Sequence, residues 1–498
     1  MKESSRVCRP LRYFCTAGNG MEQFLVEEII SKLSAYEVDH VSGKVFFTTS
    51  AEIVKLTELK SAERLFLLLK KAPPLNVAWK KGSENVMRLI QDQIMGGHQA
   101  WADGLSAWLS FQKDLQDCSM KPSDAIKGQK KKRKVEEEEE EEMGGKSLYD
   151  RASLAQTPAE TCYPGHETGS TEDEVSMVAN CIEERTSCEA DESTSSNQSP
   201  VSFRVCCRCS GIIAKKFSTQ ELGRIIGMAI TRQLGWKVDL RHPELEVNVH
   251  LSDNLCVLGI PVLRFPLAHR TYIKITGLRS TTAWVMASLA GIKPGCLVLD
   301  PMCGVGTILL EAAKEWQNAF FLGFDNDELQ LKRVQENVRF ADLMNRIELI
   351  KASVMEIPLP SSSVDAIVCD IPFGRKYCSN TDIRAALPAI VKEMERVLRT
   401  EGNLVLLLSP QLSVFLKKIL GQDCWLNRRP AADSLAERVE VQCAEEVTVK
   451  GVTEEKTNPN CSSATSQLCP SLVLNGTYRL SLGATDALIH RYKKVSLT

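Results

Sequence analysis

The chain has 498 residues, of which 43% are hydrophobic, and its 61 Lys and Arg against 63 Asp and Glu give a net charge of −2. This composition is typical of a globular protein, and the length exceeds that of one ordinary domain, so we expect at least two packed domains. The balanced charge excludes a chain that is basic throughout, and any nucleic-acid surface must therefore be local.

The apolar segments and the cysteines exclude two further classes. Apolar runs such as 65–69 and 404–408 are far shorter than the roughly 18 residues of a membrane helix, which predicts a soluble chain with no membrane partner. Residues 1–14 lack the apolar core of a signal peptide and the cysteines are scattered, so we expect a reducing compartment. The Cys-Cys-Arg-Cys run at 206–209 lacks a second ligand pair for zinc, so buried thiols are favoured and no metal site is predicted.

Residues 1–75 alternate short strand-like and helical patterns. We expect strands at 11–16 and 44–48 and amphipathic helices at 22–33 and 51–56. This pattern predicts a small domain containing both helices and strands.

Residues 76–200 form a linker and insertion that we expect to be largely disordered from about residue 116. Apolar periodicity ends there, Ser, Thr, Glu and Gly dominate, and a basic run at 130–134 precedes an acidic run at 136–142. The basic segment 130–135 resembles a nuclear localisation signal and predicts a nuclear protein. The alternative is a solvated linker whose charges balance.

Periodic patterns return at residue 201. The first part predicts strands at 202–207, 237–239, 244–250 and 256–260 and a helix at 218–234. Beyond residue 277, strands at 297–300, 320–325, 347–351, 364–369 and 403–408 alternate with helices at 307–316, 327–340 and 383–398. This alternation predicts a parallel, doubly wound sheet. A polar insertion at 451–466 precedes a hairpin formed by 478–482 and 487–492.

A glycine-containing turn follows the strand that ends at Asp300. Gly304 and Gly306 let a ligand approach the backbone, and the helix that follows offers free N–H groups to an anion. Asp325 lies roughly 20 residues further on, where such folds place a carboxylate against ribose, and Asn326 would flank the base. A tight structural turn and a helix cap at Asp325 are the alternatives. Without a GKS/T loop, S-adenosylmethionine and NAD remain the candidate ligands.

The segment Asp370-Ile371-Pro372-Phe373 follows a buried strand at the same edge of the sheet. An exocyclic amine attacks a methyl donor only if acceptors hold its N–H groups, and Asp370 with the Ile371 carbonyl can supply them. Phe373 can stack on a base. The alternative is a buried Phe beside a proline turn.

Together these motifs resemble the class I methyltransferases that modify amino groups, whose signature is Asp or Asn, two prolines, then Tyr or Phe. They resemble in particular the THUMP-domain guanine-N2 methyltransferases of RNA, through segments 13–28, 203–261 and 277–283. The resemblance implies an α/β chain made of a ferredoxin-like domain at 1–75, a THUMP RNA-binding module at 201–266 and a Rossmann-like methyltransferase domain at 267–498.

The same resemblance implies the roles of individual residues. Asp370, Pro372 and Phe373 would hold guanine, and Ile371 replaces the first proline of the signature. Ser353 stands where related enzymes often carry an acidic adenine contact. The residues around S-adenosylmethionine would be Thr281, Asp300, Gly304, Gly306, Asp325, Asn326 and Ser353.

The implied activity is N2-methylation of a guanosine in a structured RNA, with small nuclear RNA slightly favoured over tRNA by the nuclear signal. The family works with a small zinc-binding activator subunit, so a heterodimer is expected. Arg270 and Tyr272 are further candidate RNA contacts. Two alternatives stay open: a non-catalytic RNA-binding adaptor with a degenerate methyltransferase fold, and an amino-methyltransferase acting on tRNA or protein.

Overall fold

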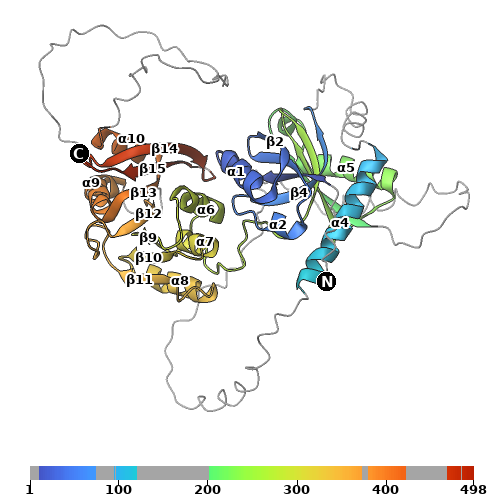
Figure 1. The fold of residues 1–498 in the computed structure, drawn as a ribbon. Coiled ribbons are helices and arrows are strands. Elements are labelled where there is room, and N and C mark those ends of the chain that lie inside the picture. Colours follow the sequence, from blue (N-terminus) through green and yellow to red (C-terminus); the bar gives the residue numbers. More distant parts are fainter. Residues whose placement is uncertain are drawn as a thin grey trace, which may run out of the picture. The chain divides into compact units, whose positions relative to one another are not determined.

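The computed structural model describes residues 10–74, 95, 97–119, 201–372, 380–421, 468–483 and 485–497. Within these ranges the strands form a sheet of eight and a sheet of seven. Each sheet belongs to one half of the chain in sequence (Figure 1). None of the helices in the same ranges is long and apolar enough to cross a membrane.

The N-terminal segment has the order strand, helix, strand, strand, helix, strand. Its elements are β1 (Leu11–Thr16), α1 (Glu22–Leu33), β2 (Tyr36–Val41), β3 (Lys44–Thr49), α2 (Ile53–Thr57) and β4 (Arg64–Ala72). The strands lie in the order β2-β3-β1-β4, all antiparallel. This arrangement is ferredoxin-like, as expected.

The second part of this half extends the same sheet. Its elements are α4 (His98–Ser119), β5 (Ser202–Cys209), α5 (Thr219–Leu234), β6 (Lys237–Val238), β7 (Leu245–Leu251) and β8 (Cys256–Pro261). β8 pairs antiparallel with β4, so the complete order is β2-β3-β1-β4-β8-β7-β5-β6. The ferredoxin-like and THUMP segments therefore share one continuous sheet.

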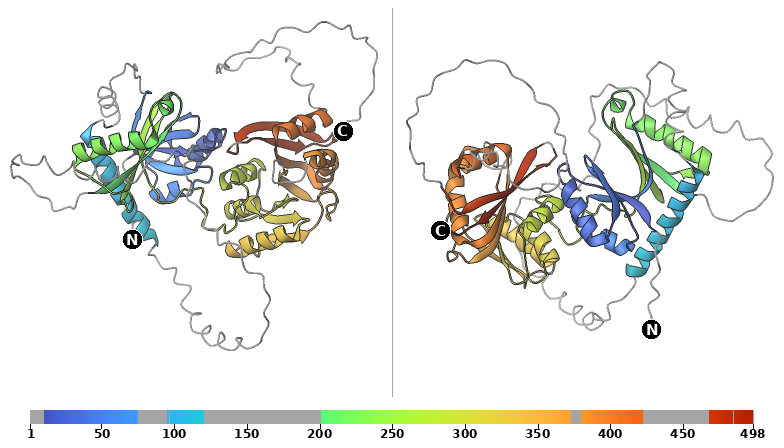
Figure 2. Two further views of the ribbon diagram at one scale, coloured as in Figure 1. Left: turned by 180° about the vertical axis from the view of Figure 1, so that it is seen from behind. Right: turned by 45° about the horizontal axis from the view of Figure 1, so that its top comes forward.

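The helices of this half cover one face of its sheet. Tyr13 and Cys15 pack with α1, and Leu258 and Ile260 pack with α4 and α5. His98 Nε2 lies 3.0 Å from the Gln233 carbonyl where α4 meets the end of α5 (Figure 2). Because strand side chains alternate, the opposite face carries a separate apolar cluster: Phe14, Phe46, Phe66, Leu255 and Val257.

The C-terminal half is a mostly parallel sheet of order β11-β10-β9-β12-β13-β15-β14. Its strands are β9 (Leu297–Asp300), β10 (Phe320–Asp325), β11 (Ile347–Lys351), β12 (Val364–Asp370), β13 (Leu398–Leu408), β14 (Leu472–Ser481) and β15 (Asp486–Lys494). The last two form an antiparallel hairpin that pairs with β13. The predicted doubly wound fold with a closing hairpin is confirmed.

Helices cover both faces of this second sheet (Figure 1). α6 (Ser280–Leu289), α7 (Thr307–Glu315) and α8 (Glu328–Phe340) pack on one face. α9 (Asn380–Val397) and α10 (Pro410–Ile419) pack on the other. Among the described α-helices and strands, five have no counterpart among those predicted: β2, β4, α4, α6 and α10. Of these, α4 lies inside the span 76–200 that the sequence assigns to a linker.

Candidate functional site

Three aspartates end three neighbouring strands of the seven-stranded sheet. Asp325, Asp300 and Asp370 are the last residues of β10, β9 and β12, which are adjacent in that order. These strands are parallel, so the three carboxyl ends meet at one edge. The connections leave β9 in opposite directions on its two sides, and open α/β sheets bind ligands at such a point.

The glycine turn after β9 is shaped by two glycines with positive φ. Gly306 has φ +81°, and a Cβ atom there would lie 2.3 Å from Val334 Cγ2, so a larger residue does not fit. Gly304 has φ +53°, and no atom would lie within 4 Å of its Cβ. The turn therefore leaves open space above Gly304 and leads into the N-terminus of α7, where backbone N–H groups are free for a ligand.

Asp325 ties this turn to the neighbouring strand. Its Oδ2 accepts from Gly304 N at 2.9 Å, and its Oδ1 accepts from Asp327 N at 2.9 Å. The cap of α8 is Asp327, whose Oδ1 accepts from Leu329 N at 2.9 Å, so the helix-cap reading of Asp325 is wrong. A carboxylate has about four lone-pair positions, so Asp325 keeps acceptor capacity for a hydroxyl group.

The three carboxylates create an unfavourable concentration of negative charge. Burial, together with Asp370 and Asp325, raises the pKa of Asp300 well above its usual range. Burial also raises the pKa of Asp370 to about 7. Among the described residues, none of the three has an ion-pair partner. The site is therefore suited to a ligand that carries positive charge.

A buried asparagine, which the sequence analysis did not single out, fixes the glycine turn after β9 from the side of α8. Asn337 Nδ2 donates to the Ile275 and Val305 carbonyls, both at 2.9 Å. Its Oδ1 accepts from Lys274 N at 3.1 Å and Ile275 N at 2.8 Å. The only sequence signal is its place among the buried Val334 and Val338 on the apolar side of α8.

The other candidate cofactor residues lie in different surroundings. Thr281 is buried in α6. The segment before α6 lies close to the glycine turn, since a Cβ on Gly277 would lie 2.5 Å from Val305 Cγ2. Asn326 is exposed directly after Asp325. Ser353 is exposed in the turn after β11, where its Oγ accepts from Met355 N at 3.2 Å.

The candidate base-binding segment begins at the end of β12. Ile371 is fully buried, and its N–H donates to the Leu407 carbonyl at 3.1 Å, which fixes the backbone directly after Asp370. Pro372 is half-buried. Phe373 lies outside the described residues.

The reading of Arg270 as an RNA contact is wrong. Its side chain is buried, with Nε donating to Glu311 Oε1 at 3.0 Å and Nη2 donating to the Lys60 carbonyl at 2.6 Å. The Tyr272 hydroxyl donates to the same Glu311 oxygen at 2.8 Å. Both side chains are engaged in an internal polar cluster on α7.

Two family models match the chain: an RMKL-like methyltransferase domain over residues 268–424 and a THUMP domain over residues 180–260. The chain is 42% identical to U6 snRNA (guanine-N(2))-methyltransferase THUMPD2 of Bos taurus, over 99% of this chain and 97% of the relative. The chain belongs to the THUMP-domain guanine-N2 RNA methyltransferase family. It is an enzyme of this class, and S-adenosylmethionine is its methyl donor.

Other members and solved structures agree with this assignment. The THUMPD2 enzyme of Homo sapiens is 40% identical over 97% of this chain and 96% of its own length. tRNA (guanine(6)-N(2))-methyltransferase THUMP3 of Homo sapiens is 27% identical, over 82% of each chain. The crystal structure of TrmN from Thermus thermophilus shares the fold at a TM-score of 0.55 and 18% identity, over 97% of this chain and 100% of that one.

Proposed function

We propose that this family member methylates N2 of a guanosine in U6 snRNA, with the glycine turn and the strand-end aspartates as its active site. The observation that carries the proposal is the row of three carboxylates at the ends of β10, β9 and β12, which form no ion pair within the described part of the chain. The U6 substrate follows from the full-length similarity to the THUMPD2 enzymes.

The described residues fit S-adenosylmethionine, which supplies a methyl group on a positively charged sulfur. We assign Asp300 and the open turn at Gly304 and Gly306 to its amino-acid end, because the buried carboxylates stabilise positive charge and free N–H groups accept a carboxylate. Asp325, already oriented by Gly304 N, accepts from the ribose hydroxyls. Thr281 lies beside the ligand, and the exposed Asn326 and Ser353 lie toward the adenine.

The guanine amine is assigned to Asp370, Pro372 and Phe373. The Asp370 carboxylate accepts an N–H from the amine and so localises the nitrogen lone pair toward the methyl group. The Ile371 backbone, fixed by its bond to Leu407, presents a second acceptor, and Phe373 stacks on the base. Asp370 must be ionised for this role, which its raised pKa makes sensitive to pH near neutrality.

Transfer of labelled methyl from S-adenosylmethionine to U6 snRNA, followed by nucleoside analysis, tests the proposal. We expect N2-methylguanosine from the wild type and at least a hundredfold loss in Asp370→Ala, with cofactor affinity changed by no more than about tenfold. Transfer to tRNA instead of U6 snRNA would show that the substrate class is that of the THUMP3 relatives. Cofactor binding without transfer to any RNA would favour the adaptor alternative.

We also propose that a small zinc-binding activator subunit docks beside β11. β11 is an edge strand with unpaired backbone groups on its outer side. Large apolar side chains are exposed on it and on the segments around it: Phe320, Leu329, Phe340, Met344, Ile350 and Met355. A contiguous exposed apolar patch on a monomer often marks a docking site, and we assign that role to these side chains.

Co-purification of the two subunits tests this surface. We expect Ile350→Asp and Met355→Asp to abolish capture of the activator. Val414→Asp is the control, because Val414 is also an exposed apolar residue but lies on α10, on the other face of the sheet. Undiminished capture by both variants at β11 would refute the docking site.

We propose a nuclear location, supported by the basic run 130–135 and the U6 relatives. The run lies outside the described residues. Replacing Lys130, Lys131, Lys132, Arg133 and Lys134 with alanine should move a fluorescent fusion to the cytoplasm. Unchanged nuclear fluorescence would show that the basic run is not the nuclear localisation signal.

A further inference from the structure

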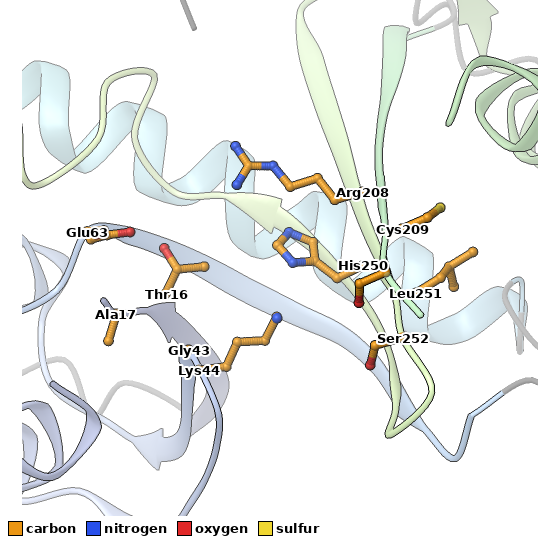
Figure 3. A pocket seen from close by; sticks show the side chains of 11 residues that line it. Thr16, Ala17, Gly43, Lys44, Glu63, Arg208, Cys209, His250, Leu251 and Ser252 are labelled. Carbon is orange, nitrogen blue, oxygen red and sulfur yellow. The ribbon is translucent and has the colours of Figure 1, made fainter. Parts of the chain in front are cut away.

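A hollow of about 250 Å³ lies on the N-terminal sheet, far in sequence from the methyltransferase motifs. The ends of β1, β3, β5 and β7 surround it (Figure 3). The side chains that matter for its chemistry are Thr16, Lys44, Glu63, Arg208, His250 and Ser252. Figure 3 shows the polar ends of Arg208, His250 and Lys44 directed into the same space.

The hollow opens on the face of the sheet that the helices leave uncovered. Arg208 and His250 are register partners on β5 and β7. The His250 ring contacts Phe14 and Phe66, whose ring centroids lie 6.1 and 6.2 Å away, and these belong to the apolar cluster on the open face. A ligand can therefore reach Arg208 and His250 without displacing a helix.

The carboxylate among the lining residues, Glu63, is paired with Arg279 at 3.3 Å and not with the cations of the hollow. Among the described residues, Lys44 and Arg208 form no ion pair, whereas Lys71 on the same sheet pairs with Asp39 at 2.8 Å. Burial, and then the Arg208 charge, lower the pKa of Lys44. An arrangement of this kind costs free energy unless an anion enters.

We propose that this hollow seats a phosphate group of the substrate RNA, with Lys44 and Arg208 as charged donors. The inference rests on the proposed function for its ligand, since the substrate is an RNA. Thr16 adds a hydroxyl donor and the His250 ring adds a neutral donor, whereas the Ser252 hydroxyl already donates to the Leu255 carbonyl at 3.0 Å. Phosphate matches this set because its several oxygens accept charge-assisted bonds from different directions.

The test is RNA affinity and methyl-transfer kinetics in charge-removing variants of the full chain with its activator. We expect Lys44→Ala and Arg208→Ala each to weaken RNA binding about tenfold. Each should also lower the slope of log affinity against log salt concentration by about 1, the value for one phosphate contact. KM for RNA rises, while kcat and the affinity for S-adenosylmethionine stay at wild-type values. Lys44→Arg keeps the charge and restores affinity.

Lys71→Ala is the matched control, because Lys71 is a cation of the same sheet that is already paired with Asp39. An equal loss of affinity in this control would indicate a diffuse basic face and overturn the assignment to the hollow. Wild-type affinity in both hollow variants would overturn it as well. If the wild type transfers no methyl group to RNA, the proposed function is wrong. If the variants show normal transfer with a normal KM, only the phosphate site in the hollow is wrong.

RNA with and without a terminal phosphate identifies which phosphate is bound. If the penalty of Lys44→Ala disappears on dephosphorylated RNA, the hollow holds a terminal phosphate. If the penalty persists, it holds a phosphodiester of the backbone. Both results support the site.

Discussion

At the scale of single residues, Asp370 combines a proposed role in binding the guanine amine with a cost in stability. Its folded-state pKa of about 7 lies above the ordinary value of 3.8 because the carboxyl is buried. A raised carboxyl pKa means that the folded state prefers the protonated form, so stability is lost as pH rises from about 4 through 7. Active sites often retain charges that destabilise the empty protein.

We therefore expect Asp370→Asn to be inactive but more stable than the wild type. At pH 8 its free energy of unfolding should rise by roughly 1–3 kcal/mol, and the gain should shrink toward pH 5, where the wild-type carboxyl is already neutral in the folded state. Urea unfolding at the two pH values measures this. Asp114→Asn, on an exposed face of α4, is the control and should change little. A gain that does not depend on pH would contradict the role of charge.

The same residue predicts a pH effect on cofactor binding. Raising the pH through about 7 ionises Asp370, which adds negative charge beside a positively charged ligand. The affinity for S-adenosylmethionine should increase about three- to tenfold between pH 6 and pH 8. Calorimetric titration of the wild type and of Asp370→Asn tests this. An increase of the same size in the variant would assign the effect to another group.

At the scale of elements, the glycine turn after β9 depends on α8 as much as on its own glycines. Asn337 makes four hydrogen bonds that join the backbone of Lys274 and Ile275, in the segment before α6, to Val305 in the glycine turn. Asn337→Ala leaves these buried groups unpaired and should lower the free energy of unfolding by about 2–4 kcal/mol, because each unsatisfied group costs about 1–3 kcal/mol before relaxation. Cofactor affinity should fall with it.

Gln335→Ala is the matched control for this prediction, since Gln335 is an exposed amide on the same helix. Chemical unfolding and cofactor titration of both variants provide the comparison. Equal small effects in the two variants would show that the asparagine bonds contribute little to holding the turn.

The sequence reading succeeds for elements whose pattern is local. β9, β10 and β11 are predicted with their observed bounds, because short apolar runs are followed by Asp or by charged residues. β4 is missed because its run ends in two lysines, and its pairing with β8 joins residues almost 200 positions apart. α4 is missed because its Trp101, Leu105 and Trp108 stripe lies in a segment of polar composition. Propensity alone cannot reveal such distant pairings.

Residues of the candidate site likewise fall into those that the sequence indicates and those that it does not. Asp300, Asp325 and Asp370 stand out because each ends a strand, Gly304 because it lies in the turn after one, and parallel strands bring their ends together. Asn337 and the hollow at Lys44 and Arg208 do not stand out, because they depend on contacts between segments that are distant in sequence. Arg270 shows the opposite error, since a basic residue between two domains resembles an RNA contact until its burial is known.

At the scale of the whole molecule, the ordered elements are joined by polar contacts that are buried. Glu28 of α1 is almost fully buried and accepts from Lys60 N at 2.8 Å and Ser61 N at 2.9 Å. Arg270 donates to the Lys60 carbonyl and to Glu311 of α7. A chain of contacts thus runs from the N-terminal half to α7, the helix whose N-terminus forms the proposed cofactor site.

The Arg270–Glu311 pair should therefore be costly to break from one side. The two side chains are 4% and 0% exposed, so Arg270→Met leaves a buried carboxylate without its counter-charge and should lower the free energy of unfolding by about 3–5 kcal/mol. The double variant Arg270→Met/Glu311→Leu removes both charges and should recover most of this loss. Lys274→Met, which breaks the exposed pair with Glu336, is the control and should cost less than about 1 kcal/mol. Urea unfolding of the wild type and these three variants measures the differences. If the single and double variants are equally unstable, packing of the Arg270 side chain rather than pairing of its charge holds the two halves in contact.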